Sequence, residues 1–140
     1  MDALDGDAVY EVLGFGPLVV VDEFTAVEPH LVIVPRAAVD WDSVVLPDPV
    51  AIVEVPRADG RAEYWVPRLR AYAMLPTVRH VVAVHAAAQV ALHLRRTAAG
   101  TISGRALRGG MIVLDPLSLS LDLDQAWSRL DRRRDGGGPG

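Results

Sequence analysis

Cysteine is absent from the 140 residues, and so is lysine. The absence of cysteine excludes disulfide bonds and thiolate metal sites, so a soluble cytoplasmic protein is the first expectation. No apolar run approaches the ~20 residues of a membrane-spanning helix. The acidic start, MDALDGDAVY, also lacks the basic flank of a secretion signal. We therefore expect no membrane partner and no export.

All 14 basic residues are arginine, which together with the abundant alanine, valine and glycine fits a GC-rich genome. The formal net charge of −4 gives no support to tight, non-specific DNA binding, because such binding needs a positive field that faces the phosphates. The sign of the charge can vary locally, so nuclease chemistry stays open.

Hydrophobic residues make up 51% of the chain and charged residues 23%, which is the composition of a globular domain with a buried core. We expect a single domain over residues 1–134. A flexible glycine-rich tail over residues 135–140 is expected to follow it.

Short runs rich in valine and isoleucine, bounded by proline, aspartate or glycine, predict that most of the chain forms strands. The predicted strands are Pro17–Glu23, His30–Pro35, Val50–Val55, Arg79–His85, Gln89–Arg96, Gly109–Pro116 and Leu117–Leu123. Helical spacing predicts a helix over Arg61–Leu75, with Pro67 in its first turn, and a short helix over Asp124–Arg133. This order predicts an α/β (α+β) fold with a mixed sheet, one main covering helix and a C-terminal β-meander.

Glu54, inside the apolar run VAIVEV, is the best candidate for chemistry. A carboxylate there is costly to bury without a partner or a metal. Metal-dependent hydrolysis of a phosphodiester needs such carboxylates, clustered on rigid elements, to hold Mg²⁺. A glutamate near a strand end that pairs with an arginine is an equally weighted interpretation.

Asp48 precedes Glu54 in LPDPVAIVEV and gives the appearance of the PD…E motif of metal-dependent nucleases. Six residues of extended chain span ~20 Å, so the two carboxylates cannot share a metal on one strand. Asp48 is flanked by Pro47 and Pro49, and we assign it to the turn that enters the strand.

Several spaced motifs resemble the Uma-type restriction endonuclease family, a branch of the PD-(D/E)XK nuclease superfamily. They are DPVAIVEV, PRLRAYAMLPTVRHVVAV, the hairpin strand QVALHLRR and the closing GGMIVLDPLSLSLDLDQAW. The resemblance covers roughly Val27 to Trp127 and implies a restriction-endonuclease-like fold.

Mapped by this resemblance, Glu54 matches the glutamate of the family's site and His30, in EPHLVIVP, stands where the family has aspartate. The helical aspartate falls at Tyr64 and the lysine at Arg68. Residues four apart share a helical face. Arg68 keeps the positive charge, but a guanidinium cannot lose its proton and forms bidentate pairs with carboxylates. An Arg68–Glu54 salt bridge is therefore the structural alternative to a catalytic site.

The resemblance implies a bacterial, Mg²⁺-dependent endonuclease that hydrolyses DNA. A ring nitrogen of His30 as metal ligand favours Mn²⁺ or Zn²⁺ over the hard Mg²⁺. With two of four polar site positions replaced, we interpret the chain as a shortened, degenerate member whose activity is weakened or lost. If it is active, Glu54 and His30 hold the metal and Arg68 stabilises charge on the phosphate. The alternative is a non-catalytic module that binds protein or DNA. A homodimer and a missing N-terminal segment both stay open.

Three histidines, His80, His85 and His93, fall on the two strands of the predicted hairpin. Packing is the favoured interpretation, and a zinc site is the weaker one because no recognised ligand spacing is present. SGRALRGG resembles a phosphate loop only superficially, since no Walker lysine follows, and we expect no nucleotide cofactor.

Overall fold

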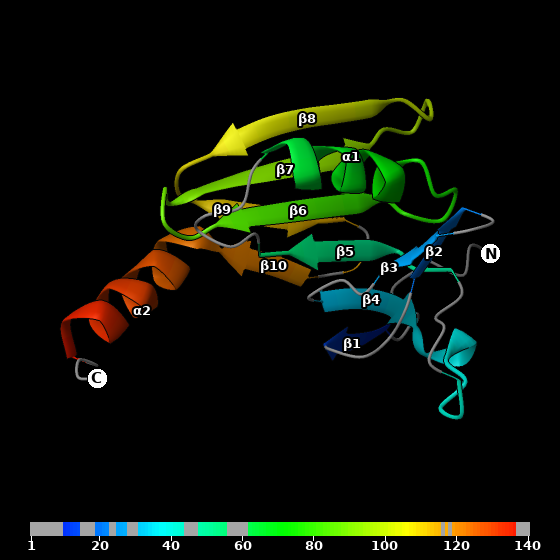
Figure 1. Ribbon diagram of the computed structural model, residues 1–140, viewed down its shortest axis with the longest axis horizontal. Coiled ribbons are helices and arrows are strands. Elements are labelled where there is room, and N and C mark those ends of the chain that lie inside the picture. The colour runs from blue at the N-terminus through cyan, green and yellow to red at the C-terminus, as the bar shows by residue number, and fades with distance from the viewer. Residues whose placement is uncertain are drawn as a thin grey trace.

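The computed structural model describes residues 10–14, 19–22, 25–27, 31–43, 48–55, 62–115, 117 and 119–136. A six-stranded sheet with the order β1-β4-β5-β6-β7-β8 dominates it (Figure 1). These strands are β1 (Tyr10–Gly14), β4 (Leu31–Pro35), β5 (Ala51–Glu54), β6 (His80–His85), β7 (Val90–Arg96) and β8 (Ile102–Leu107). Two smaller sheets pair β2 (Val19–Asp22) with β3 (Thr25–Val27), and β9 (Met111–Leu114) with β10 (Leu119–Asp122). A 3₁₀ turn, η1 (Arg36–Ala38), follows β4.

The large sheet is mixed because β5 and β6 run parallel, while its other neighbouring strands are antiparallel. Parallel neighbours need a crossover connection, usually a helix. Here the crossover contains α1 (Ala62–Ala73), which lies in front of the sheet in Figure 1. This connection brings the end of β5 and one face of α1 together.

Each face of the large sheet has its own core. On the α1 face, Val32, Val34, Ile52 and Val81 pack with Leu69 and Tyr72 of the helix. The other face is covered by the β9–β10 hairpin, which lies behind the sheet in Figure 1, and by Trp127 of α2 (Leu123–Gly136). We call this second face the hairpin face. Because side chains alternate along a strand, strands β4, β5, β6 and β7 each contribute to both cores.

The predicted fold class is confirmed: a mixed sheet, a main covering helix, a C-terminal hairpin and a closing helix are all present. The predicted β6–β7 hairpin is also confirmed, with register His80↔Arg95 through His85↔Val90. Neither helix of the described residues is long and apolar enough to cross a membrane.

Three details differ from the sequence-based expectation. Helix α1 begins at Ala62, so Pro67 lies inside it rather than in its first turn. Proline there removes one backbone hydrogen bond, and Pro67 sits on the exposed side of the helix. Helix α2 runs to Gly136 and so includes the first two residues of the predicted tail. The edge strand β8 was not predicted, because its residues from Ile102 to Ala106 are all exposed and show no apolar alternation.

Arg96 of β7 closes the carboxyl end of α1. Its guanidinium donates hydrogen bonds to the carbonyl oxygens of Ala73 (2.5 Å), Leu75 (3.1 Å) and Val78 (3.0 Å). The last carbonyls of a helix have no partner within it, and a cation is favourable at that end of the helix dipole. Arg96 therefore ties the helix to the sheet.

Replacing Arg96 by methionine is expected to lower the free energy of unfolding by about 2 kcal/mol, since these carbonyls lose a charged donor. Urea denaturation measures the change. Arg95→Met is the matched control: the neighbouring side chain is exposed, points to the opposite face and should cost less than about 0.5 kcal/mol. Equal losses in the two variants would contradict the capping role.

Candidate active site

Glu54 occupies the last position of β5 and is 5% exposed. Ala51 and Val53 of the same strand point into the hairpin-face core, whereas Ile52 points towards α1. By the same alternation Glu54 points towards α1. The strand is buried along its whole length, so this carboxylate is held in an apolar setting.

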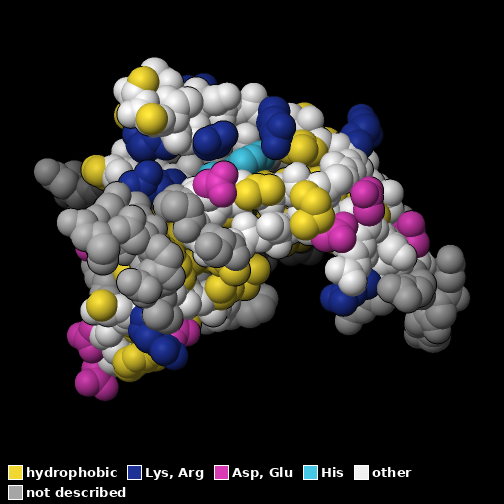
Figure 2. Space-filling view, turned by 180° about the vertical axis from the view of Figure 1, so that it is seen from behind, with side chains coloured by type: hydrophobic (Ala, Val, Ile, Leu, Met, Phe, Trp, Pro, Cys, Tyr) yellow, Lys and Arg dark blue, Asp and Glu magenta, His cyan; other side chains and the backbone are white. Residues whose placement is uncertain are grey.

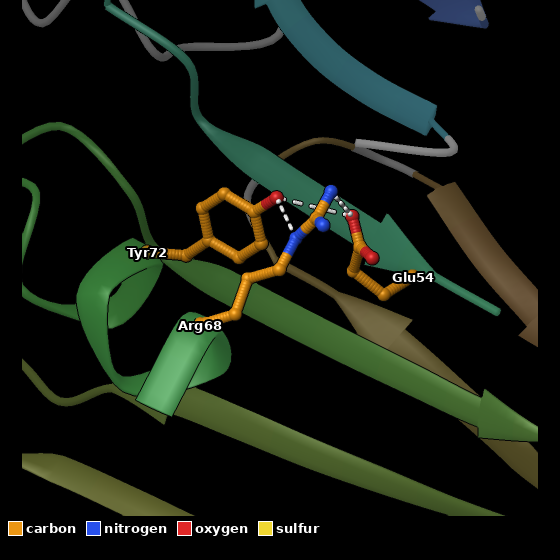
Figure 3. A network of polar contacts seen from close by, with 3 residues as sticks. All are labelled: Glu54, Arg68 and Tyr72. Atoms are coloured by element: carbon orange, nitrogen blue, oxygen red, sulfur yellow. Dashed lines mark hydrogen bonds and ion pairs between the residues drawn. The ribbon is translucent and has the colours of Figure 1, made fainter. Parts of the chain in front are cut away.

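Two side chains of α1, Arg68 and Tyr72, meet the carboxylate (Figure 3). They are four residues apart and therefore share one face of the helix. The Tyr72 hydroxyl donates to Oε1 of Glu54 at 3.1 Å, and Nη2 of Arg68 donates to the same oxygen at 3.4 Å. Nε of Arg68 also donates to the Tyr72 hydroxyl oxygen at 2.9 Å. The three groups form a closed polar triangle.

Electrostatics keep this triangle in one protonation state. Burial raises the pKa of Tyr72, and the nearby charge of Glu54 adds to the rise, against the opposing effect of Arg68. Burial lowers the pKa of Arg68, but the hydrogen bond to Tyr72 and the charge of Glu54 outweigh it and leave the pKa raised. Arg68 therefore stays charged and Tyr72 stays protonated across the physiological range.

The structure brings together two of the residues singled out in the sequence, Glu54 and Arg68, in the geometry of the salt-bridge alternative. His30 lies outside the described residues, as does the side chain of Tyr64. Asp48 lies in the turn before β5 with a φ of 54°, in agreement with its assignment to a turn. No feature of the structure places it beside Glu54.

Tyr72 is the site residue that sequence reasoning missed. In the sequence it occupies one of the apolar positions at helical spacing, with Leu69 and Leu75, that predict the helix. The signal was nevertheless present, because Arg68 and Tyr72 are spaced i and i+4 and a buried tyrosine usually finds a partner for its hydroxyl.

The described residues do not fit a divalent metal at this position. A hard cation needs free carboxylate or carbonyl oxygens, whereas Oε1 of Glu54 already accepts from both a guanidinium and a hydroxyl. Within the ranges that the structure describes, no group of three His, Cys, Asp or Glu residues is placed to hold a metal ion.

The sequence and the structure were compared with those of known proteins. No protein-family model matches the sequence. No curated protein matches it either. The structure is similar to the crystal structure of a protein described as a putative nuclease belonging to DUF820, from Anabaena variabilis, with a TM-score of 0.68 and 8% identity. The match covers 86% of this chain and 69% of that chain. The chain has a nuclease-like fold.

The nuclease-like fold confirms the architecture that the sequence resemblance implied. At 8% identity the similarity speaks for the fold, and the chemistry must come from the residues of this chain. The closed triangle of Glu54, Arg68 and Tyr72 lies where β5 of the nuclease-like fold meets its covering helix.

Two histidines form a second buried polar group on the hairpin face of the nuclease-like fold. Nδ1 of His80 lies 2.9 Å from Nε2 of His93, and Nε2 of His80 lies 2.5 Å from the carbonyl oxygen of Asp115. A carbonyl only accepts, so His80 donates from Nε2 and accepts at Nδ1 from His93. His85 lies at the other end of β6, where its ring accepts from the amide of Ala88. Of the three histidines on the hairpin, two are therefore buried and bond to each other, while His85 lies apart from them.

Proposed function

We propose that this chain is a restriction-endonuclease-like protein in which metal-dependent hydrolysis of DNA is weakened or lost. The observation that carries the proposal is the contact of Arg68 and Tyr72 with Oε1 of Glu54. A fold similar to that of a protein described as a nuclease supports the ancestry. The triangle of Glu54, Arg68 and Tyr72 supports the weakening or loss of metal-dependent hydrolysis.

The positive charge beside Glu54 opposes the binding of a divalent cation there. A metal-dependent nuclease needs its carboxylate to face a divalent cation, which activates water and stabilises charge on the phosphate. Here a permanently charged guanidinium already neutralises the carboxylate. A lysine could act as a proton donor or acceptor after a pKa shift, but the guanidinium of Arg68 cannot lose its proton. Arg68 is thus suited to hold the fold together at this point.

A nuclease assay on supercoiled plasmid DNA, with Mg²⁺ and separately with Mn²⁺, tests the proposal. We expect the wild type to leave the plasmid intact with both ions, at the level of Glu54→Ala. Asp48→Ala is the control for loss of a carboxylate outside the triangle, since Asp48 is an exposed turn residue. Metal-dependent nicking by the wild type and by Asp48→Ala, abolished in Glu54→Ala, would refute the loss of activity.

A further inference from the structure

The charges of the chain are strongly segregated along the sequence. Between Glu63 and Asp115 there is no acidic residue, while seven arginines lie in that stretch, a formal charge of +7. The remainder of the chain has 18 acidic residues against seven arginines, a formal charge of −11, which yields the total of −4. The basic stretch comprises α1 after Glu63 and strands β6, β7, β8 and β9, so a molecule of negative net charge carries a positive end of its large sheet, at β6, β7 and β8.

Strand pairing places two of these arginines on the hairpin face. Arg95 lies opposite His80 on one side and Ser103 on the other, and Arg105 lies opposite His93. Directly paired residues of antiparallel strands share a face of the sheet. The two arginines and Ser103 are exposed, while the two histidines beneath them are buried.

We call Arg95, Ser103 and Arg105 the β7–β8 basic surface. It lies beside the part of the sheet that the β9–β10 hairpin covers, because β8 contributes no fully buried residue to that core. Figure 2 views the hairpin face and shows basic side chains above the histidine that is visible there and an acidic side chain directly below it.

These two arginines differ from those that have a structural partner. Arg36 pairs with Glu11, Arg68 with Glu54, and Arg96 with four carbonyls. The side chains of Arg95 and Arg105, by contrast, make no hydrogen bond or ion pair within the part of the chain that the structure describes. Their charges are therefore available to a ligand.

The pKa values of the buried histidines are lowered in part by the arginines of this surface. Burial lowers the pKa of His93 to about 4, and electrostatic interactions with His80, Arg105 and Arg95 lower it further. Burial also lowers the pKa of His80, with opposing contributions from Asp115 and further lowering by Arg95 and Arg79. Asp115 is the acidic neighbour in this group, and three arginines outnumber it.

We propose that the β7–β8 basic surface binds the phosphate backbone of nucleic acid. Guanidinium groups pair with phosphate in a bidentate manner, and a serine hydroxyl can donate to a third phosphate oxygen. The interaction should be weak, because few phosphates are contacted and the whole chain is acidic. Log K should fall with log salt with a slope of about two, since about two phosphates are neutralised.

A protein partner fits this surface less well. Protein interfaces have an apolar centre, whereas Arg95, Ser103 and Arg105 offer polar groups alone. Two of the exposed apolar side chains near these strands, Ile102 and Met74, line a pocket on the α1 face, while Met111 and Val113 are exposed on β9.

The site goes beyond the proposed function because it lies on the opposite face of the sheet from Glu54. Binding there requires neither Glu54 nor a metal. A binding measurement in the presence of EDTA therefore tests this surface, while the plasmid assay tests the loss of hydrolysis, and either proposal can fail alone.

Fluorescence anisotropy with a labelled 20-base-pair duplex and a labelled single strand, in EDTA and at several salt concentrations, provides the test. We expect the wild type to bind at low salt. The double variant Arg95→Gln/Arg105→Gln should bind at least about tenfold more weakly, with the slope of log K against log salt reduced by about two, one for each lost phosphate contact. The charge-matched control Arg36→Gln/Arg70→Gln, which changes exposed residues on other elements, should bind within about twofold of the wild type.

Three results would overturn the proposal: no binding by the wild type at low salt, no loss in Arg95→Gln/Arg105→Gln, or an equal loss in the control. Sedimentation of the same proteins tests the competing possibility that an acidic protein segment, rather than nucleic acid, binds this surface. A wild type that self-associates at low salt, becomes monomeric in Arg95→Gln/Arg105→Gln and ignores both nucleic acids would assign the surface to an acidic protein segment. Circular dichroism confirms that the variants fold, as expected for exposed residues.

Discussion

Replacing Arg68 by methionine is expected to lower the free energy of unfolding by about 3 kcal/mol, one of the two largest effects that the structure predicts. The variant removes the positive charge beside a carboxylate that is 6% exposed. Removing one partner of a buried ion pair costs about 3–5 kcal/mol, and the lower value applies because the Arg68 side chain is 34% exposed. Urea denaturation at neutral pH measures the loss.

A double variant separates charge from packing. Glu54→Gln/Arg68→Met contains no charge at this position and should recover most of the loss, because an uncompensated charge costs more than a missing pair. Arg70→Met, an exposed change on the same helix, is the control and should stay within about 0.5 kcal/mol. If Arg68→Met were as stable as Arg70→Met, the triangle would not hold β5 and α1 together.

Acidification from pH 7 to pH 4 is expected to destabilise the fold by roughly 3 kcal/mol through His93 alone. The pKa of this buried ring is lowered from its ordinary value to about 4 in the folded state. Below pH ~6.5 the His93 ring is protonated in the unfolded chain but stays neutral in the folded chain. The free energy of unfolding therefore decreases as the pH falls towards the folded pKa. His80, whose pKa is also lowered, adds to the loss in the same direction.

Urea denaturation at pH 7, 6, 5 and 4 isolates the histidine contribution from that of the carboxylates. His93→Gln keeps a donor for Nδ1 of His80 but cannot be protonated, and its stability should fall by roughly 3 kcal/mol less over this range than that of the wild type. His85→Gln removes a histidine outside the pair and should retain the wild-type loss. The same acid loss in His93→Gln and the wild type would contradict the role of the pair.

Much of the fold was predictable because the local signals agree with the tertiary structure. The apolar runs at β4, β5, β6 and β7 are bounded by proline, glycine or turn residues, and their period fixes strands and the hairpin between β6 and β7. Strand β8 was not predictable in this way. Its residues are exposed on both faces and are held by pairing with β7, a contact between strands that leaves no apolar pattern in the sequence.

The sequence indicated which residues form the candidate site, but not whether they bind a metal or pair with each other. The sequence indicated Glu54 and Arg68 and left metal ligation and ion pairing as alternatives. Distances decide between these alternatives, and distances depend on how α1 packs on β5. The contribution of Tyr72 and the contact between His80 and His93 likewise arise from packing across elements. Periodicity says which residues share a face but not which side chains touch.

The free side of β8 affects how this protein can be kept in solution. An edge strand exposes unpaired amides and carbonyls, which invite pairing with a strand of another molecule and can lead to aggregation. Strand β8 is short and carries Gly104 and the charged Arg105 at its centre, both unfavourable for an added strand. The arginine that we assign to phosphate binding therefore also disfavours the addition of a strand from another molecule. Its exposure serves both ligand binding and protection against aggregation.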